Sequence, residues 1–532
     1  MQPVVRRNLV AAACFTASSF IIAALLVTRT VLPFYLFLPI FAAVLELIAR
    51  LYDLRILGRF SKRPSETSSS RRPQNDVYTW QQLAAHNHQE SAWIAIHGRV
   101  YDVTHFVDRH PGGRELLLLA VGRDATDLFT SYHPFTDRPA KVLERYAIGS
   151  LATFEHPVYK PDSGFYKDAS DAVKRYFETT GYDSKAWGTG FIRMLPVYVV
   201  FFAAYYGVYV VPGLSFAVRA LLCVLMGACQ GMPLTGWMHD ASHASIGRTE
   251  RWWWNVGRFA LDYVSGSSML SWRNQHVIGH HVYTNVMGAD PDLPVSLVND
   301  PRRLVPQQVW ARFYRWQHIY LPPLYGILGI KSRMQDLTEV FSRLMNGPIR
   351  VNPIIVQDYL RMVSSKAVWA FYRIVVPLAL LRTVTVSQFW VLLFVTEMTT
   401  GYWLAFNFQV SHISSDADFL FSDVSKRESG KCPAVIDEEW AHTQIKTTVD
   451  YAHNSPLAAY FSGALNYQTV HHLFPTVSQY HYPAITPIVM EVAKKHGLEF
   501  NVLSTFKDAL GAHVRHLKDM GEQGKCAELK LE

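Results

Sequence analysis

Residues 214–243 read LSFAVRALLCVLMGACQGMPLTGWMHDASH, an apolar run that ends in two histidines. Its apolar part, residues 214–238, is interrupted only by Arg219. A helix of about 17 to 25 such residues crosses a bilayer, so the run predicts a membrane span. His239 and His243 follow at its end, with the spacing that puts two side chains on one helix face. The stretch predicts a membrane protein with nitrogen ligands at a span end.

Three further stretches are apolar and weakly charged. They are residues 194–211, 366–381 and 388–410, of which the second is short and contains Arg373. We therefore predict four spans. The composition agrees, because 18% of the residues are charged, against about 25% in soluble domains. The 49% of hydrophobic residues excludes a largely disordered chain.

The net charge of +8 is compatible with nucleic acid or with an anionic membrane surface as partner. No Lys/Arg-rich recognition helix and no RNA-binding signature occurs in the sequence. We therefore interpret the charge as flanking the spans, and expect membrane lipids and no nucleic acid as partners. The five cysteines form no C-x-x-C pair, which indicates reduced thiols in a reducing compartment.

Residues 77–152 read as a small soluble domain. The run AWIAIHGRVYDVT (92–104) alternates like two strands around a tight His97-Gly98 turn. His110 begins the motif His-Pro-Gly-Gly, and His133 follows 23 residues later. Two neutral imidazoles ligate a six-coordinate electron-transfer haem, and glycine lets the backbone turn beside the ring. The alternative is a Pro-Gly-Gly turn near an unrelated surface histidine.

Three histidine clusters lie beside the predicted spans. They are HDASH (239–243), HVIGHH (276–281) and QTVHH (468–472). His276 and His280 have the spacing that places two side chains on one helix face, and Gln468 shares a face with the histidines that follow it. The predicted catalytic residues are His239, His243, His276, His280, His281, Gln468, His471 and His472, and the seven histidines among them are the predicted metal ligands. Imidazole binds Zn, Cu, Fe and Ni, and seven histidines are too many for one ion with an open position. We therefore predict two metals, on the single membrane face where the spans bring the clusters together.

Residues 77–152 resemble a cytochrome b5 domain, and the clusters over residues 190–490 resemble those of the membrane fatty-acid desaturases. Gln468 in place of a histidine is typical of the front-end branch, which also carries an N-terminal cytochrome b5 domain. Four further runs are similar to delta-5 members of lower eukaryotes: GADPD (288–292), RVNP (350–353), TTVDYAH (447–453) and HHLFPTVSQYHYP (471–483).

The resemblance implies a membrane α-helical fold with four spans and a small α+β haem domain. It implies haem b between His110 and His133, although Tyr132-His133-Pro134 departs from the family's usual surroundings of the second ligand. It also implies two iron ions and adds His412, at the end of the fourth span, as a metal ligand. Asp240, Asp290 and Asp292 either orient imidazoles or belong to turns and caps.

The N-terminal part departs from the family pattern. Residues 1–60 hold two hydrophobic stretches, 9–28 and 31–46, flanked by arginines, and a polar linker occupies 61–76. One interpretation is a cleaved signal peptide. We favour a membrane hairpin with both ends in the cytosol, because a signal peptide would place the haem domain away from cytosolic reductant. Residues 491–532 are expected to be a cytosolic tail.

The implied reaction is front-end desaturation, which places a cis double bond between an existing one and the carboxyl end. Neither carbon has an acidic proton, so a cofactor must carry the chemistry. We expect delta-5 selectivity (20:3n-6 to arachidonate, 20:4n-3 to eicosapentaenoate), with O2 as co-substrate. NADH-derived electrons would come from NADH-cytochrome b5 reductase, and the substrate would be an acyl-CoA or acyl-phospholipid. The protein would be a multi-pass protein of the endoplasmic reticulum, with the haem domain and the clusters facing the cytosol.

Other functions remain open at this point. Within the family, delta-4, delta-6 and delta-8 selectivity are alternatives to delta-5. A fatty-acyl or sphingolipid hydroxylase uses a similar iron site but leaves oxygen in the product. A membrane-anchored electron carrier would leave the three clusters unexplained. A zinc transporter would place its ligands near the bilayer midplane, whereas these clusters lie at span ends.

Overall fold

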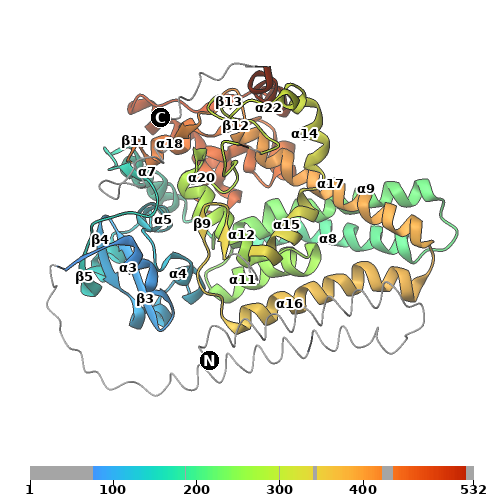
Figure 1. Cartoon of the computed structure of the whole chain (residues 1–532), viewed down its shortest axis with the longest axis horizontal. Helices are drawn as coiled ribbons and strands as arrows, with labels where there is room; N and C mark the ends of the chain where they lie inside the picture. The colour runs from blue at the N-terminus through green and yellow to red at the C-terminus, as the bar shows by residue number, and fades with distance from the viewer. Residues whose placement is uncertain are drawn as a thin grey trace.

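The computed structural model describes residue 43, residues 76–421 and residues 435–522, apart from residues 186, 299, 340–343. The predicted hairpin therefore falls outside the described residues, except for residue 43, and so does nearly all of the linker. Figure 1 shows a small domain on the left, a rod of long helices on the right, and a C-terminal region above them. The predicted class, a helical membrane core with a small α+β domain, is confirmed.

The small domain is built on a five-stranded sheet in the order β1-β5-β4-β3-β2. Its strands are β1 (Asp76–Tyr78), β2 (Asn87–His88), β3 (Ser91–Ile96), β4 (Arg99–Asp102) and β5 (Ala147–Leu151). Only β1 and β5 pair in parallel. The predicted turn between β3 and β4 is present, with φ of +50° at His97 and +72° at Gly98, as a two-residue hairpin turn requires. The helices are α3 (Trp80–Ala85), α4 (Arg114–Ala120), α5 (Thr126–Tyr132) and α6 (Arg138–Leu143).

Four of the described helices are long and apolar enough to cross a membrane. They are α8 (Trp187–Tyr209), α9 (Phe216–Pro233) with its continuation to Ser242, α16 (Val356–Ala370) with its continuation to Leu381, and α17 (Val386–His412). These four helices form the rod of Figure 1. The third begins at Val356, well before the predicted border at residue 366. Asp358 and Arg361 made this part look polar, but they form an ion pair on the helix, 3.5 Å apart.

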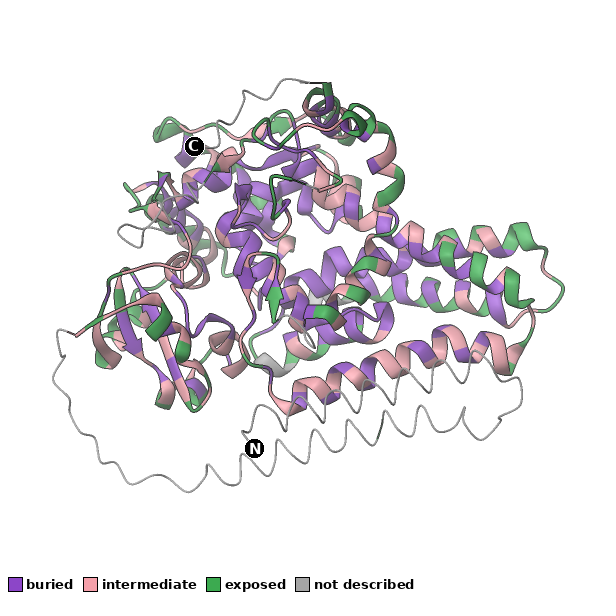
Figure 2. Cartoon of the chain, in the orientation of Figure 1, coloured by how far each residue is buried: buried purple, intermediate pink, exposed green. Residues whose placement is uncertain are grey.

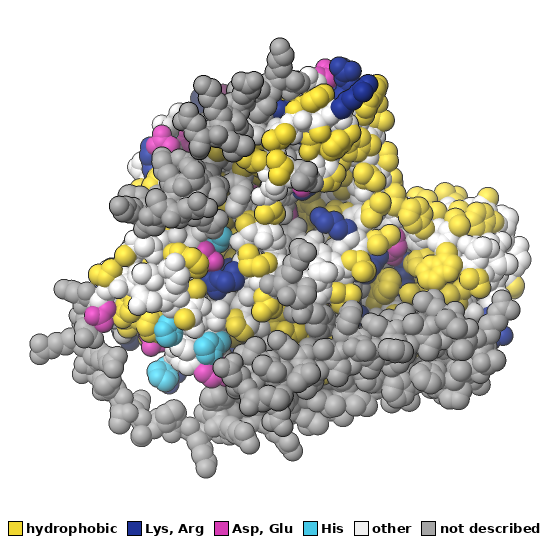
Figure 3. Space-filling view, in the orientation of Figure 1, with side chains coloured by type: hydrophobic (Ala, Val, Ile, Leu, Met, Phe, Trp, Pro, Cys, Tyr) yellow, Lys and Arg dark blue, Asp and Glu magenta, His cyan; other side chains and the backbone are white. Residues whose placement is uncertain are grey.

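The rod has a buried inside and an apolar outside. Leu221 is 70% exposed and Val199 is 63% exposed, and hydrophobic side chains gather on the part of the rod that is visible in Figure 3. Inside, α9 and α17 approach closely, because a Cβ on Gly227 would lie 2.5 Å from the carbonyl oxygen of Thr396. Small residues permit such contact between membrane helices. Large apolar surfaces on the outside of a protein mark contact with lipid or another protein.

Two charged residues of the spans, Glu397 and Arg373, form a buried ion pair. Glu397 on α17 pairs with Arg373 at 2.8 Å and with Arg333 of α15 (Leu328–Thr338). This pairing explains how Arg373 is accommodated in the third span, because a buried charge is strongly destabilising only when its partner is missing.

The C-terminal region carries the third histidine cluster above the rod (Figure 1). It contains α18 (Trp440–Lys446), α19 (Pro456–Ser462), α20 (Gln468–Leu473), α21 (Tyr482–Lys495) and α22 (Phe506–Glu522). Helix α22 contacts α17 and α14 (Gln317–Tyr325), with Leu517 fully buried. Up to Glu522, the segment expected to be a tail is therefore folded against the body. Figure 2 shows buried residues concentrated where this region meets the rod.

The small domain docks on the rest of the chain through the RVNP segment. The Arg350 guanidinium donates to Glu155 at 2.9 Å and to the carbonyl oxygen of Gly122 at 2.7 Å. The Asn352 amide donates to the carbonyl oxygens of Leu118 and Val121 at 2.8 and 2.9 Å. The contact fixes the end of α4 relative to the histidine clusters.

Candidate functional site

Eight buried histidines from the three clusters and α17 meet in two adjacent groups. The five-histidine group contains His239, His243, His276, His281 and His471, and the three-histidine group contains His280, His412 and His472. Within each group, one nitrogen from every residue lies within 4.8 Å of all the others. Segments far apart in sequence thus converge, as the predicted topology required.

The spacing of the nitrogens fits a metal ion in the five-histidine group. Nε2 of His276 lies 2.9 Å from Nε2 of His239 and 3.2 Å from Nε2 of His281. Two nitrogens bound to one ion at about 2.1 Å, at right angles, would lie about 3 Å apart. Nε2 of His243 and of His471 are buried without a hydrogen-bond partner among the described residues. A metal ion is the group that such convergent, unpartnered nitrogens would hold.

The three-histidine group includes the glutamine of the third cluster. Nε2 of His280 lies 3.3 Å from Nε2 of His412. The Gln468 amide nitrogen lies 2.9 Å from Nε2 of His412 and 3.1 Å from Nε2 of His472. The Gln468 amide oxygen is buried and has no hydrogen-bond partner among the described residues. Rotating the amide would turn this oxygen toward the group, so Gln468 offers a fourth, neutral ligand.

Neighbouring histidines of one cluster are divided between the two groups at two places, although the rings of His276 and His280 stack with centroids 5.6 Å apart. His276 and His280 lie in η5 (Asn274–His280), a π-helix, in which hydrogen bonds join residues five apart. His276 therefore joins His281 in the five-histidine group, while His280 points to the other group. On α20, His471 and His472 also separate, and Gln468 stays with His472. The π-helix lets one short segment serve both groups.

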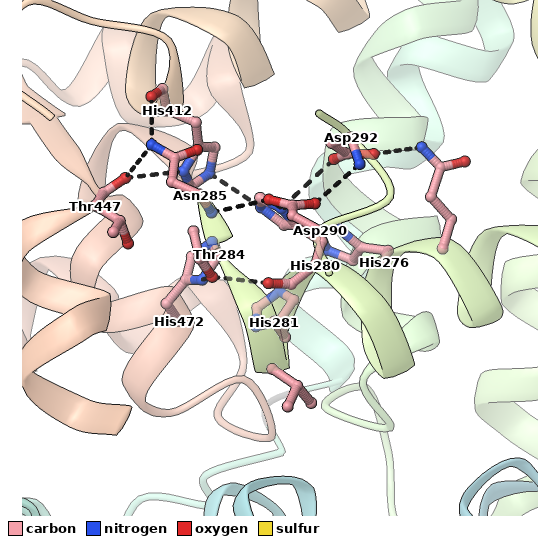
Figure 4. A network of polar contacts seen from close by, with 12 residues as sticks. His276, His280, His281, Thr284, Asn285, Asp290, Asp292, His412, Thr447 and His472 are labelled. Carbon is pink, nitrogen blue, oxygen red and sulfur yellow. Dashed lines mark hydrogen bonds and ion pairs between the residues drawn. The ribbon is translucent and has the colours of Figure 1, made fainter. Parts of the chain in front are cut away.

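Several imidazoles are held through their second nitrogen (Figure 4). Nδ1 of His280 lies 3.1 Å from the Asp290 carboxylate, and Nδ1 of His412 lies 3.3 Å from the carbonyl oxygen of Thr447. An acceptor at Nδ1 fixes the proton there and leaves Nε2 free for a metal. Asp292 lies 3.6 Å from His280. Asp290 therefore orients the His280 imidazole, which was one of the two interpretations of this residue from the sequence.

Other contacts of this kind could not be predicted from sequence. Nδ1 of His472 lies 2.8 Å from the Gln444 side-chain oxygen. Nδ1 of His471 lies 3.0 Å from the Tyr482 hydroxyl. Neither partner belongs to a histidine cluster, so no local spacing marked it, although Tyr482 lies in the 471–483 run. The Asp240 carboxylate accepts from the Ser478 hydroxyl at 2.8 Å and from the backbone of Gln479, and so joins α10 (His239–Ser242) to the segment that follows the third cluster.

Burial favours the neutral form of most of the clustered imidazoles. It lowers the pKa of His276, His281 and His471 well below the usual value. Burial also lowers the pKa of His280, but the Asp290 charge and hydrogen bond outweigh it, so the net pKa lies above the usual value. Neutral imidazole is the form that binds metals.

The small domain brings its two candidate haem ligands, His110 and His133, close together. The rings of His110 and His133 have centroids 6.4 Å apart. This separation agrees with the roughly 6 Å expected if two imidazoles bind one ion from opposite sides at about 2 Å. Nδ1 of His110 lies 2.9 Å from the Gly113 carbonyl oxygen, and Nδ1 of His133 lies 2.9 Å from that of Phe129. Both rings therefore direct Nε2 away from the backbone.

The His-Pro-Gly-Gly motif has a steric reason. A Cβ on Gly112 would lie 2.8 Å from Cε1 of His110, so any larger residue would displace the ring. Gly113 has a φ of +91°, which favours glycine. Burial lowers the pKa of His110, and it lowers the pKa of His133 to about 4. The residues present fit a haem held by two neutral imidazoles.

One contact joins the two sites directly. The Tyr132 hydroxyl lies 3.1 Å from Nδ1 of His243. Tyr132 precedes His133 in the chain, in the segment that departs from the usual surroundings of the second haem ligand. No sequence pattern predicted this contact, because it joins residues 111 positions apart.

A helical membrane core that gathers eight histidines, joined to a haem-type domain, defines a membrane-bound oxidoreductase. The family models agree. Residues 214–504 match the model described as fatty acid desaturase, and residues 79–152 match the cytochrome b5-like haem/steroid binding domain. The chain belongs to the fatty acid desaturase family, with a fused cytochrome b5-like domain. Its substrate is accordingly a lipid, and its chemistry involves electron transfer.

Curated relatives cover most of the chain. The chain is 40% identical over 444 residues to "Delta(5) fatty acid desaturase A" of Dictyostelium discoideum, which covers 84% of this chain and 94% of the relative. It is 37% identical over 462 residues to "Acyl-lipid (8-3)-desaturase" of Mortierella alpina, and this match covers 85% of this chain and 99% of the relative. It is 30% identical over 376 residues to "sn-1 linoleoyl-lipid 6-desaturase" of Synechocystis, and this match covers 70% of this chain and 99% of the relative.

Proposed function

We propose that the protein is a front-end desaturase that introduces a cis double bond at delta-5 of a polyunsaturated acyl chain. The observation that carries the proposal is the convergence of eight histidines and Gln468 beside a docked cytochrome b5-like domain. Delta-5 selectivity is supported by the names of the relatives, which are Delta(5) and (8-3) desaturases at 37–40% identity. The reaction would take O2 as co-substrate.

The metal ligands would be divided between two iron ions. The five-histidine group would hold one, and the three-histidine group with Gln468 would hold the other. Bound iron would supply the O2-dependent oxidising power that removal of hydrogen from unactivated carbons requires. The protein's own residues orient the ligands, as Asp290 does for His280, and the burial of the histidines would keep water from a substrate bound beside them.

The electron balance requires a donor of two further electrons. Removing two hydrogens from the acyl chain yields two electrons, whereas reduction of O2 to two waters takes four. The remaining two would arrive singly through a haem between His110 and His133, from NADH by way of NADH-cytochrome b5 reductase. The fused domain keeps the donor at high effective concentration near the site. We place the protein in the endoplasmic reticulum membrane, with both sites facing the cytosol where this reductant is available.

The test is the fatty-acid profile of yeast expressing the full chain and fed one acid at a time. Conversion of 20:3n-6 to arachidonate and of 20:4n-3 to eicosapentaenoate is expected. A His276→Ala variant should give no product, whereas His88→Ala, on the exposed surface of the haem domain, should behave like wild type. New double bonds only in 18-carbon or 22-carbon acids would replace delta-5 by another selectivity, and hydroxy acids would replace desaturation by hydroxylation.

A further inference from the structure

One side chain joins the haem domain to the metal site. Tyr132 is the last residue of α5, and His133 follows it directly. The Tyr132 hydroxyl meets Nδ1 of His243 at 3.1 Å, and Nε2 of His243 lies in the five-histidine group without a hydrogen-bond partner among the described residues. One peptide bond and one hydrogen bond therefore link a candidate haem ligand to a candidate metal ligand.

The contact lies in an apolar interface between the two domains. Leu119 and Leu128 of the haem domain pack with Val277 and Ile278 of the second histidine cluster, and Tyr132 packs against the same cluster of side chains. In Figure 1, α5 lies between the sheet of the small domain and the histidine-bearing helices, and it contacts α13 (His281–Tyr283). Hydrogen bonds are stronger and better fixed in such a low-dielectric setting.

The chemistry of the contact follows from the two side chains. Because Nε2 of His243 points into the five-histidine group, Nδ1 carries the ring proton. This N–H donates a hydrogen bond to the phenol oxygen of Tyr132. Burial raises the pKa of Tyr132 above its usual value, so the phenol stays protonated and neutral. The hydrogen bond fixes both the ring orientation of His243 and the position of α5 above it.

We propose that Tyr132 is a positioning residue for electron transfer, holding His133 and His243 in one continuous bonded path from haem to metal. The inference rests on the proposed desaturase function. In each transfer one electron would leave a haem held by His110 and His133, and it would reduce a metal ion held by the five-histidine group. No bond forms or breaks, and Tyr132 keeps both its proton and its electrons. Two transfers supply the two electrons that the acyl chain does not provide.

The test compares two tyrosines of the same interface in the full-length holoenzyme. Tyr132→Phe removes only the hydroxyl of the path. Tyr159→Phe is the matched control, because the Tyr159 hydroxyl donates to the carbonyl oxygen of Val282 at 2.7 Å across the same interface but lies off the path. The haem is reduced anaerobically and mixed with O2 and substrate, and its reoxidation is followed in the Soret band. Rates are normalised to the haem and iron bound in each variant.

Tyr132→Phe should slow haem reoxidation by about tenfold or more, the usual cost of losing a partner of a metal-bound histidine. Tyr159→Phe should match wild type. The haem midpoint potential and the iron content should stay unchanged in both. With zinc in place of iron, wild type and both variants should reoxidise equally slowly. When a small redox mediator reduces the metal ions in the histidine groups directly, without the haem, Tyr132→Phe should recover the wild-type rate of single-turnover product formation.

Equal reoxidation rates in Tyr132→Phe and wild type would overturn the inference. So would a slow variant that has lost its iron or that the mediator does not rescue, because Tyr132 would then only support the fold. If wild type makes no new double bond but its haem reoxidises in an iron-dependent and Tyr132-dependent way, the path stands and the proposed function fails. If wild type makes product and Tyr132→Phe reoxidises normally, the function stands and the path fails.

Discussion

The phenol oxygen of Tyr132 lies 3.1 Å from Nδ1 of His243. A side chain of the haem domain therefore contacts a member of the five-histidine group directly. This contact depends on how the domain is docked. Arg350 and Asn352 of the RVNP segment bind backbone carbonyls at the end of α4, and thereby hold the domain at a fixed distance. A fused electron donor with a defined docking site does not need to diffuse to its acceptor.

The first prediction concerns this docking. Arg350→Ala removes the bidentate pair with Glu155 and the bond to Gly122, and should weaken the domain contact by about 2 kcal/mol, as for hydrogen bonds of a charged group. Haem reoxidation should slow while haem content stays at the wild-type level. Arg99→Ala, which breaks an exposed pair with Glu144 inside the small domain, is the control. Wild-type kinetics in Arg350→Ala would show that this contact does not position the donor.

The second prediction concerns Gln468. Gln468→Ala removes the side chain that lies between His412 and His472. Iron content should fall toward one ion per chain, and turnover should drop by at least about tenfold. Gln468→Glu keeps an oxygen at the same place and should retain more iron than the alanine variant. Iron is measured by elemental analysis of the purified protein; two ions bound at wild-type affinity in Gln468→Ala would argue against a ligand role.

The third prediction separates charge from orientation at Asp290. Asp290→Asn keeps an oxygen that can accept from Nδ1 of His280, whereas Asp290→Ala removes the acceptor. Metal affinity of the three-histidine group should therefore fall in the order wild type, Asn, Ala, with the alanine variant weakened about 10- to 100-fold. Asp290 also accepts from the backbone of Asn285 at 2.9 Å, so thermal unfolding is recorded alongside. Equal affinity in all three proteins would assign Asp290 to the turn alone.

The sequence predicted the elements of the site better than their grouping. The spans and the three clusters could be read from hydropathy and motif spacing, whereas His412 was implied only by the resemblance to the desaturases. The structure brings the histidines of all these segments together. Their division into two groups could not, because His276 and His280 are four apart on a π-helix, whereas the spacing argument assumes an α-helix. A π-helix depends on packing that no local residue pattern records.

Contacts between segments were also beyond sequence reasoning. Gln444 and Tyr482 bind His472 and His471 from separate helices, and each is an ordinary residue in its own segment. The early start of the third span was missed because Asp358 and Arg361 count as polar, although they neutralise each other in the fold. Pairing in three dimensions, rather than residue type, decides whether a charge interrupts a span.

The last prediction is a pH dependence of the domain interface. Asp127 lies in the first turn of α5, and burial together with the nearby Asp124 raises its pKa to about 8. In the unfolded chain this carboxyl loses its proton near its ordinary pKa of about 4. Between these values the folded protein binds one proton more than the unfolded chain, so stability should fall as the pH rises, by at most about 1.4 kcal/mol per pH unit.

Asp127→Asn removes this titration while it keeps the size of the side chain. The difference in free energy of unfolding between the variant and wild type should therefore grow in favour of the variant from pH 5 to pH 8, and then level off. Asp171→Asn, on the exposed face of α7 (Phe165–Thr180), is the control and should show a constant difference. Denaturant unfolding of the full chain in detergent, followed by the haem absorbance, measures the α5 region. A difference that is flat over this range would mean that Asp127 is ionised in the folded protein, and that solvent reaches α5 at the domain interface.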